Sequence, residues 1–490
     1  MRTASATRTV AGFVAVLATV AVALAWSPIA GAAAALFVFF VGTVAYLFPR
    51  LPQVYAALLG GGLIGYAFLG RGFAYLGYPP LFVGEVLLAL GITVVLLRGR
   101  VGSVLATPLS WPILIFIGIG AASTLPYLGV HGIDALRDAT LWAYSAFALI
   151  GAGLVRTEAH VWAIVQRYRA VLPFFVAFIP VATALTFVPG FRFPVTPFSD
   201  VAMVSIKGGD VAVHLAGILA FLMLGLYQLA PGRTARRSTG WTGEWLLWLA
   251  WLTTWLTTLP GRAALLTVSL IGGLLFVLRP TARWLRLGTI VAVVALTALV
   301  FDLEFDVGRG RTLSPQGLMV AVVSIVDTAG PVGANFDGTR RWRLDWWGDI
   351  LDYTVFGPYF WTGKGYGINL ADADGYQVHA DGTLRSPHNG HMTVLARSGV
   401  PGAVVWLTLN VLYLAALSRA ALRHHLEGRL AWSRLCLWLA AYWLAFLVNG
   451  TFDVFLEGPQ GGIWFWSVVG MSLAVLRVQP RSVAGAPRAR

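Results

Sequence analysis

The stretch Ala263–Leu278, AALLTVSLIGGLLFVL, decides the class of fold because it holds no charged side chain. Arg262 precedes it directly, and the arginine-rich sequence RPTARWLR follows it at 279–286. An α-helix crosses about 30 Å of hydrocarbon with about 20 predominantly apolar residues, and in lipid its backbone polar groups must be paired within the segment. We therefore predict a membrane-spanning helix with cations at both ends.

The same pattern recurs along the chain. Of its 490 residues 58% are hydrophobic and only 11% are charged, whereas soluble domains carry about a quarter charged residues. The alternation of apolar and polar residues that marks outer-membrane barrels does not recur. The sequence thus predicts an all-α polytopic membrane protein of about 14 spans. The predicted spans are 9–26, 28–48, 54–70, 80–97, 111–128, 136–155, 171–189, 211–230, 244–259, 263–278, 288–304, 400–418, 432–450 and 460–476.

The net charge of +14 does not indicate a nucleic-acid partner, because the arginines fall in short clusters between the apolar runs. Cytoplasmic loops retain such clusters. The arginine clusters occur in every second loop along the chain, and this alternation predicts that both termini are cytoplasmic. The first apolar run is long and is followed at once by another, so we expect a retained helix and not a cleaved signal peptide.

Four regions follow from this topology. We predict an N-terminal transmembrane bundle at 1–303, an extracytoplasmic cap loop with short helices at 304–390, C-terminal transmembrane helices at 391–476 and a basic cytoplasmic tail at 477–490. Within the cap, the stretch Thr339–Tyr353, TRRWRLDWWGDILDY, has aromatic residues near helical spacing. It either lies at the headgroup level, which aromatic side chains favour, or packs on the bundle as a cap helix.

Several cations fall on the predicted outer face, where short loops usually lack them. Arg262 begins a helix there, and it either holds an anion or reaches to phospholipid headgroups. Lys207, in IKGGDVAVHLAG, precedes another helix start, where two glycines allow close approach and free N–H groups favour an anion. His214, one turn further along, is better explained as a hydrogen-bonded histidine inside the bundle.

The stretch SPHNGHMTVLARSGVPG, at 386–402, joins the cap to the next apolar run. It predicts a short helix capped by Ser386 or Asn389, with His388 and His391 on one face and a break at Gly399. No third metal ligand has suitable spacing, so we predict no metal site and no cofactor. A histidine beside fixed cations stays neutral, and the neutral form accepts a proton. His388 is therefore the candidate general base.

Together these features describe a site beside lipid on the outer face. Cations would hold a diphosphate and stabilise charge on the departing oxygen, while His388 takes the proton of an attacking sugar hydroxyl. Such a site suits a reaction whose leaving group is a polyprenyl diphosphate.

At these residues the sequence resembles the O-antigen ligase and polysaccharide polymerase family of membrane glycosyltransferases, over about residues 190–470. HNGHMTVLARSGVPG is similar to the family's His-Asn motif, and LPGRAALLTVSLIGGLLFVL to its arginine-bearing helix start. The segments RRWRLDWWGDILDYTVFGPYFWTGKGYGIN and KGGDVAVHLAG resemble two further family segments. Where the family often has an acidic residue before Gly-x-x-Gly, this chain has Arg397, and Lys207 stands where the family usually has arginine.

The resemblance implies a GT-C-type helical bundle with a large extracytoplasmic loop, in the plasma membrane and in cell-envelope biosynthesis. It implies metal-independent transfer of a glycan from an undecaprenyl or similar polyprenyl diphosphate to a glycan or glycolipid acceptor. Carried over by position, His388 is the base, and Arg262, Lys207 and Arg343 bind the lipid diphosphate. Further candidates at the site are Asn389, His391, His214 and Asp453.

Two other functions fit a multi-span chain. A flippase for lipid-linked sugars would often show internal repeats and charges near mid-membrane, and neither is evident here. A shape-and-division type peptidoglycan polymerase also has many spans and a large outer loop, but the His-Asn motif is not its mark. Ligation and polymerisation use the same site and remain alternatives, as do the identities of the glycan and the acceptor.

Overall fold

The computed structural model describes residues 48–78, 81–229, 241–258, 262–279, 281–301, 305–306, 312–313 and 331–478. The chain divides into two compact units, residues 1–59 and 60–490, and the site described below lies within the second. The first two predicted spans and the tail beyond residue 478 fall almost wholly outside the described residues.

In each of the other twelve predicted spans, most of the described residues are helical. The longer helices are α3 (Leu51–Leu69), α5 (Val83–Leu97), α7 (Ser110–Thr124), α9 (Ile133–Ala143), α10 (Ala146–Leu154), α11 (Glu158–Leu185), α12 (Gly208–Met223), α13 (Trp241–Thr258), α14 (Arg262–Leu278), α15 (Ala282–Val300), α17 (Pro331–Thr354), α19 (Gly390–Leu426), α20 (Leu430–Gly450) and α21 (Pro459–Arg477). Short elements connect them: η1 (Phe48–Arg50), α4 (Arg71–Ala74), α6 (Val101–Leu105), η2 (Leu125–Tyr127), α8 (Leu128–His131), α18 (Leu370–Ala373), and the antiparallel pairs β1 (Gly77–Tyr78) with β2 (Leu81–Phe82) and β3 (Phe305–Asp306) with β4 (Thr312–Leu313).

Six helical segments among the described residues are long and apolar enough to cross a membrane. They are α3, Ser110–His131, α11, α15, α19 and α20, and three shorter helices are also apolar. The chain is therefore a mostly helical membrane protein, while the count of fourteen spans stays a prediction.

Within the predicted span 136–155 the helix is interrupted between α9 and α10. At the break both the backbone N–H and the hydroxyl of Ser145 donate to the carbonyl of Trp142, at 3.1 and 2.6 Å. These bonds tighten the turn and redirect the chain.

The centre of the second unit is α12, whose side chains are buried on every side from Asp210 to Met223. A helix that is apolar all round belongs inside a bundle, and α12 packs against α13, α14 and α20. Gly217 permits a close approach to α20, since a Cβ there would lie 2.6 Å from the Tyr442 ring. Trp438 on the same helix donates to the Gly217 carbonyl at 3.0 Å.

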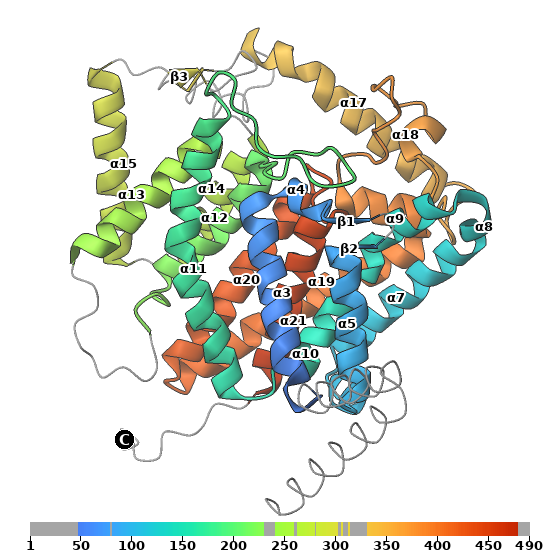
Figure 1. Cartoon of the computed structure of the whole chain (residues 1–490), viewed down its shortest axis with the longest axis horizontal. Helices are drawn as coiled ribbons and strands as arrows, with labels where there is room; N and C mark the ends of the chain where they lie inside the picture. The colour runs from blue at the N-terminus through green and yellow to red at the C-terminus, as the bar shows by residue number, and fades with distance from the viewer. Residues whose placement is uncertain are drawn as a thin grey trace, which may run out of the picture. The chain divides into compact units, whose positions relative to one another are not determined.

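Residues 331–389 of the cap pack on the first half of α19. Trp346 and Ile350 of α17 are fully buried with Leu370 and Leu395 in one apolar cluster. The burial of these two side chains favours the second alternative for Thr339–Tyr353, a cap helix that packs on the bundle. Figure 1 shows α17 and α18 at the same end of the bundle as α4 and the β1–β2 hairpin.

The two ends of α21 carry different groups. At its final residue, Arg477 donates to the carbonyls of Ser103, Ala152 and Val155, near Arg100, which bonds to Gly153. The loop before α21 carries Asp453 and meets residues from the predicted outer loops. Cations that the sequence predicts on the cytoplasmic side thus lie at one end of α21. Residues that it predicts on the extracytoplasmic side lie at the other end.

Candidate active site

His388 lies immediately before α19 in a backbone conformation that side chains seldom adopt. Its φ is +52°, in the left-handed region, which costs an L-residue roughly 1–2 kcal/mol. The Asn389 side chain caps α19 by accepting from the backbone N–H groups of His391 and Met392, at 2.9 and 3.2 Å. This confirms the predicted cap at Asn389, and the predicted break appears at Gly399, with φ of +64°.

The expectation that His388 and His391 share a helix face is wrong, because His388 lies outside the helix that Asn389 caps. The His391 imidazole accepts from the Trp406 indole N–H at 3.0 Å, and its other nitrogen is 3.2 Å from the carbonyl of Leu447. His391 is therefore fixed by α19 and α20 rather than by His388.

Asp453, between α20 and α21, is the point at which the predicted outer residues meet. Its buried carboxylate pairs directly with the ammonium of Lys207. It also lies 3.9 Å from Nη2 of Arg71 and 3.9 Å from Nδ1 of His388. Three loops that are distant in the sequence thus contribute charged groups to one place.

Arg343 on α17 completes this group from the cap side. Its Nη1 donates to the carbonyl of Phe452 at 3.2 Å, next to Asp453, and burial lowers its pKa while Asp453 opposes that shift. Trp342, the preceding residue, has its ring centre 6.3 Å from that of His388. We call His388, Asp453, Lys207, Arg71 and Arg343 the His388 cluster.

The protonation of His388 follows from these neighbours. Burial lowers its pKa to about 4, and the cations Arg343, Lys207 and Arg71 add to this effect while Asp453 opposes it. The imidazole is therefore neutral at physiological pH and able to accept a proton.

Backbone pairing places Arg71 beside Lys207. The Arg71 N–H donates to the carbonyl of Ser205 at 3.0 Å, and the Ser205 N–H donates to the carbonyl of Leu69 at 2.9 Å. Gly72 makes this approach possible, since a Cβ there would lie 2.2 Å from the carbonyl oxygens of Ala202 and Met203. The end of α3 and the segment leading into α12 are thereby held together.

A small pocket opens beside Lys207, lined in part by Tyr66, Asp210, His214 and Gln460. Asp210 lies 3.8 Å from Nε of Arg71, yet neither of its carboxylate oxygens has a hydrogen-bond partner among the described residues. The Nδ1 of His214 lies 2.6 Å from the Tyr442 hydroxyl, which confirms the interpretation of His214 as a satisfied histidine inside the bundle. Buried polar groups without a partner usually bind water or a ligand.

The structure thus brings together His388, Lys207, Arg343 and Asp453 from the predicted set. Arg262 is the first residue of α14, as predicted, and its side chain lies outside the described residues. Arg71 joins the site only through the fold, because its contact with Asp453 links residues far apart in the sequence.

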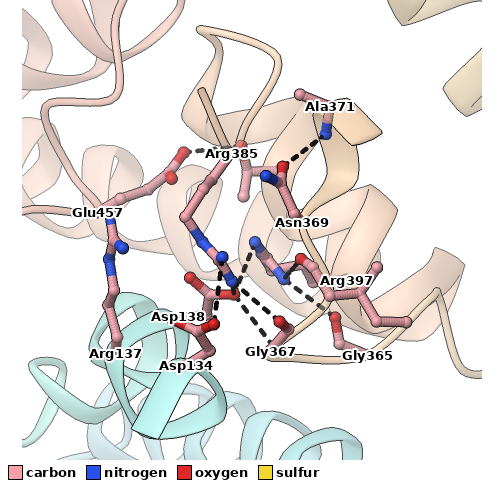
Figure 2. A network of polar contacts seen from close by, with 12 residues as sticks. Asp134, Arg137, Asp138, Gly365, Gly367, Asn369, Ala371, Arg385, Arg397 and Glu457 are labelled. Atoms are coloured by element: carbon pink, nitrogen blue, oxygen red, sulfur yellow. Dashed lines mark hydrogen bonds and ion pairs between the residues drawn. The ribbon is translucent and has the colours of Figure 1, made fainter. Parts of the chain in front are cut away.

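A second charged group lies between α9 and the cap (Figure 2). Asp138 pairs with Arg397 at 2.9 Å and with Arg385 at 3.0 Å, and it accepts the N–H of Gly367 at 3.1 Å. Arg385 also lies 3.5 Å from Asp134. We call these residues the Asp138 cluster. Arg397, which departs from the family pattern, has its charge balanced here by Asp138.

Residues 245–407 match the family model described as O-antigen ligase. Over this segment the chain is similar to the O-antigen ligase family. The matched segment contains Arg262, Arg343 and His388, whereas Arg71, Lys207 and Asp453 come from outside it. The matched segment therefore supplies His388 and Arg343, and residues outside it complete the charged group. No curated protein matches the chain.

Proposed function

We propose that the chain transfers a glycan from a polyprenyl diphosphate carrier, undecaprenyl or decaprenyl, to an acceptor hydroxyl. The observation that carries this proposal is the meeting of three cations, a carboxylate and a neutral histidine, with the histidine inside the family segment. Cations of this kind bind and stabilise a diphosphate, and a neutral histidine removes a proton.

In the proposed reaction the acceptor hydroxyl attacks the anomeric carbon of the glycan. A new carbon–oxygen bond forms as the bond to the diphosphate oxygen breaks, and the hydroxyl proton passes to His388. Lys207, Arg71, Arg343 and Arg262 offset the charge that develops on the departing diphosphate. Asp453, 3.9 Å from Nδ1 of His388, stabilises the imidazolium that results, as a carboxylate does beside a catalytic histidine.

A histidine with a pKa of about 4 is a weak base, and general bases work best when their pKa lies near the operating pH. The bound diphosphate would remedy this, because its negative charge offsets that of the surrounding cations and favours the imidazolium. Donor binding would then raise the pKa of His388 in the complex in which the proton is transferred.

The proposed setting is the plasma membrane, with both termini in the cytoplasm and the site on the extracytoplasmic face. The proposed fold is a GT-C-type bundle of about fourteen spans. The partners are the lipid-linked donor, a glycan or glycolipid acceptor and membrane lipids. Ligation and polymerisation use the same chemistry and differ in the acceptor.

The experiment that tests this function is lipid analysis of cells that lack the protein. A carrier that accumulates with a complete glycan would support ligation, and a carrier that stops at one repeat unit would support polymerisation. An unchanged pool of carrier-linked glycan would contradict both.

A further inference from the structure

Glu457 is a buried carboxyl that the proposed reaction does not use. It lies in the loop 451–458 between α20 and α21, four residues after Asp453. Its Oε1 accepts from the Thr393 hydroxyl at 2.7 Å, and the nearby Ser386 hydroxyl also favours its ionised form. Burial raises its pKa to about 7, opposed by these two hydroxyls and by Arg397.

The two hydroxyls lie on either side of His388. Ser386 precedes the histidine by two residues, and Thr393 follows it in the first turn of α19. The backbone N–H of Thr393 donates to the carbonyl of Asn389 at 2.9 Å, and the Thr393 hydroxyl oxygen lies at the same distance from that carbonyl. One carboxyl is therefore hydrogen-bonded to the first turn of α19 and lies beside Ser386 on the other flank of His388, whose φ is +52°.

The loop that carries Glu457 is itself fixed. The Thr140 hydroxyl of α9 donates to the Glu457 carbonyl at 3.0 Å, and Leu456 is buried. A Cβ added to Gly390 would lie 3.7 Å from Leu456, so the loop packs closely on the start of α19. Figure 2 shows the Glu457 carboxyl directed toward the chain beside Arg385. The same loop presents Asp453 to His388.

We infer that Glu457 is a positioning residue, which holds the backbone on both sides of His388 so that the imidazole faces Asp453. A left-handed histidine keeps its conformation only where its surroundings impose it. This inference deepens the proposed function and rests on it, because the importance of the position of His388 follows from its role as the base.

The test uses the purified full-length protein in lipid nanodiscs with carrier-linked glycan extracted from cells that lack the protein. Glu457→Ala should lower kcat by about tenfold or more and leave the donor KM nearly unchanged, because a misplaced base slows chemistry rather than binding. Glu457→Gln keeps the shape and the hydrogen bonds, so it should restore most of kcat. Thr393→Val should lower kcat by about threefold or more, as one hydrogen bond is lost.

A double variant identifies the route of the effect. Glu457→Ala combined with Thr393→Val should be little slower than Glu457→Ala alone, since both changes remove the same contact. Values of kcat within about twofold of wild type for both single variants would overturn the inference. If Glu457→Ala does not fold, Thr393→Val and Ser386→Ala decide the question on the same criterion.

A second measurement separates this inference from the proposed function. The rate at which diethylpyrocarbonate modifies His388, measured by mass spectrometry, requires no turnover. It should change in Glu457→Ala and stay as in wild type in Glu457→Gln. An unchanged rate in Glu457→Ala would overturn the positioning role, whereas a wild-type protein that transfers no glycan would instead contradict the proposed function.

Discussion

Two groups of charged side chains lie near the segment that carries His388, and they differ in how far their cations are exposed to solvent. In the Asp138 cluster, Arg397 is 2% exposed and lies 2.9 Å from Asp138. In the His388 cluster, Arg71 and Lys207 are 36% and 40% exposed, and Arg71 remains 3.8–3.9 Å from its carboxylates. Similar residue types thus form a closed structural contact in one place and an accessible cationic site in the other.

The largest expected effect is the loss of the base. His388→Ala should lower turnover by about 10²–10⁴-fold, the range that general-base catalysis contributes, while donor affinity stays close to wild type. Turnover of purified protein with the carrier-linked glycan measures this. His379→Ala is the matched control, because that histidine is exposed in the cap and should not alter the rate. A His388→Ala protein with wild-type turnover would remove the histidine from the mechanism.

The next effect is on stability and belongs to the Asp138 cluster. Arg397→Met removes one of the two arginines that neutralise the negative charge of Asp138. Breaking a buried ion pair costs about 3–5 kcal/mol. Denaturation in detergent should therefore show a much lower stability than for Lys207→Met, whose side chain is 40% exposed. Equal stabilities of the two variants would contradict the structural role given to Arg397.

The third effect concerns the accessible cluster. Lys207→Met should raise the donor KM by about tenfold, because a charged hydrogen bond to an anion contributes roughly 1.5–3 kcal/mol. Lys207→Arg keeps the charge and should retain most of the affinity. Donor titrations at two salt concentrations measure this. An unchanged KM for the methionine variant would mean that Lys207 serves only to pair with Asp453.

The sequence was sufficient for features that depend on local chemistry. Apolar runs predicted the helices because lipid allows few other backbone structures, and Asn389 predicted the cap of α19. The sidedness of the charged loops was enough to place Lys207, Arg343 and His388 on one face. These features require only neighbouring residues and a count of spans.

Other features depend on contacts between distant parts of the chain. The pairing of Arg71 with Asp453 and of Arg397 with Asp138 joins segments that carry no shared local pattern. Glu457 has no motif of its own, and its relation to His388 arises only through the packing of the loop before α21. The left-handed backbone at His388 is likewise imposed by its surroundings, since the sequence permits an ordinary helical continuation there.

The central claim is that His388 and the surrounding cations form a single diphosphate site. The pH titration of the His388 imidazole, followed by NMR of isotope-labelled histidine with His388→Ala for assignment, tests it directly. Without ligand the pKa should lie near 4, so the imidazole gains its proton only as the pH falls to that value. Undecaprenyl diphosphate should raise this pKa, because its negative charge favours the imidazolium. An imidazole pKa that does not change when the lipid diphosphate binds would contradict the account.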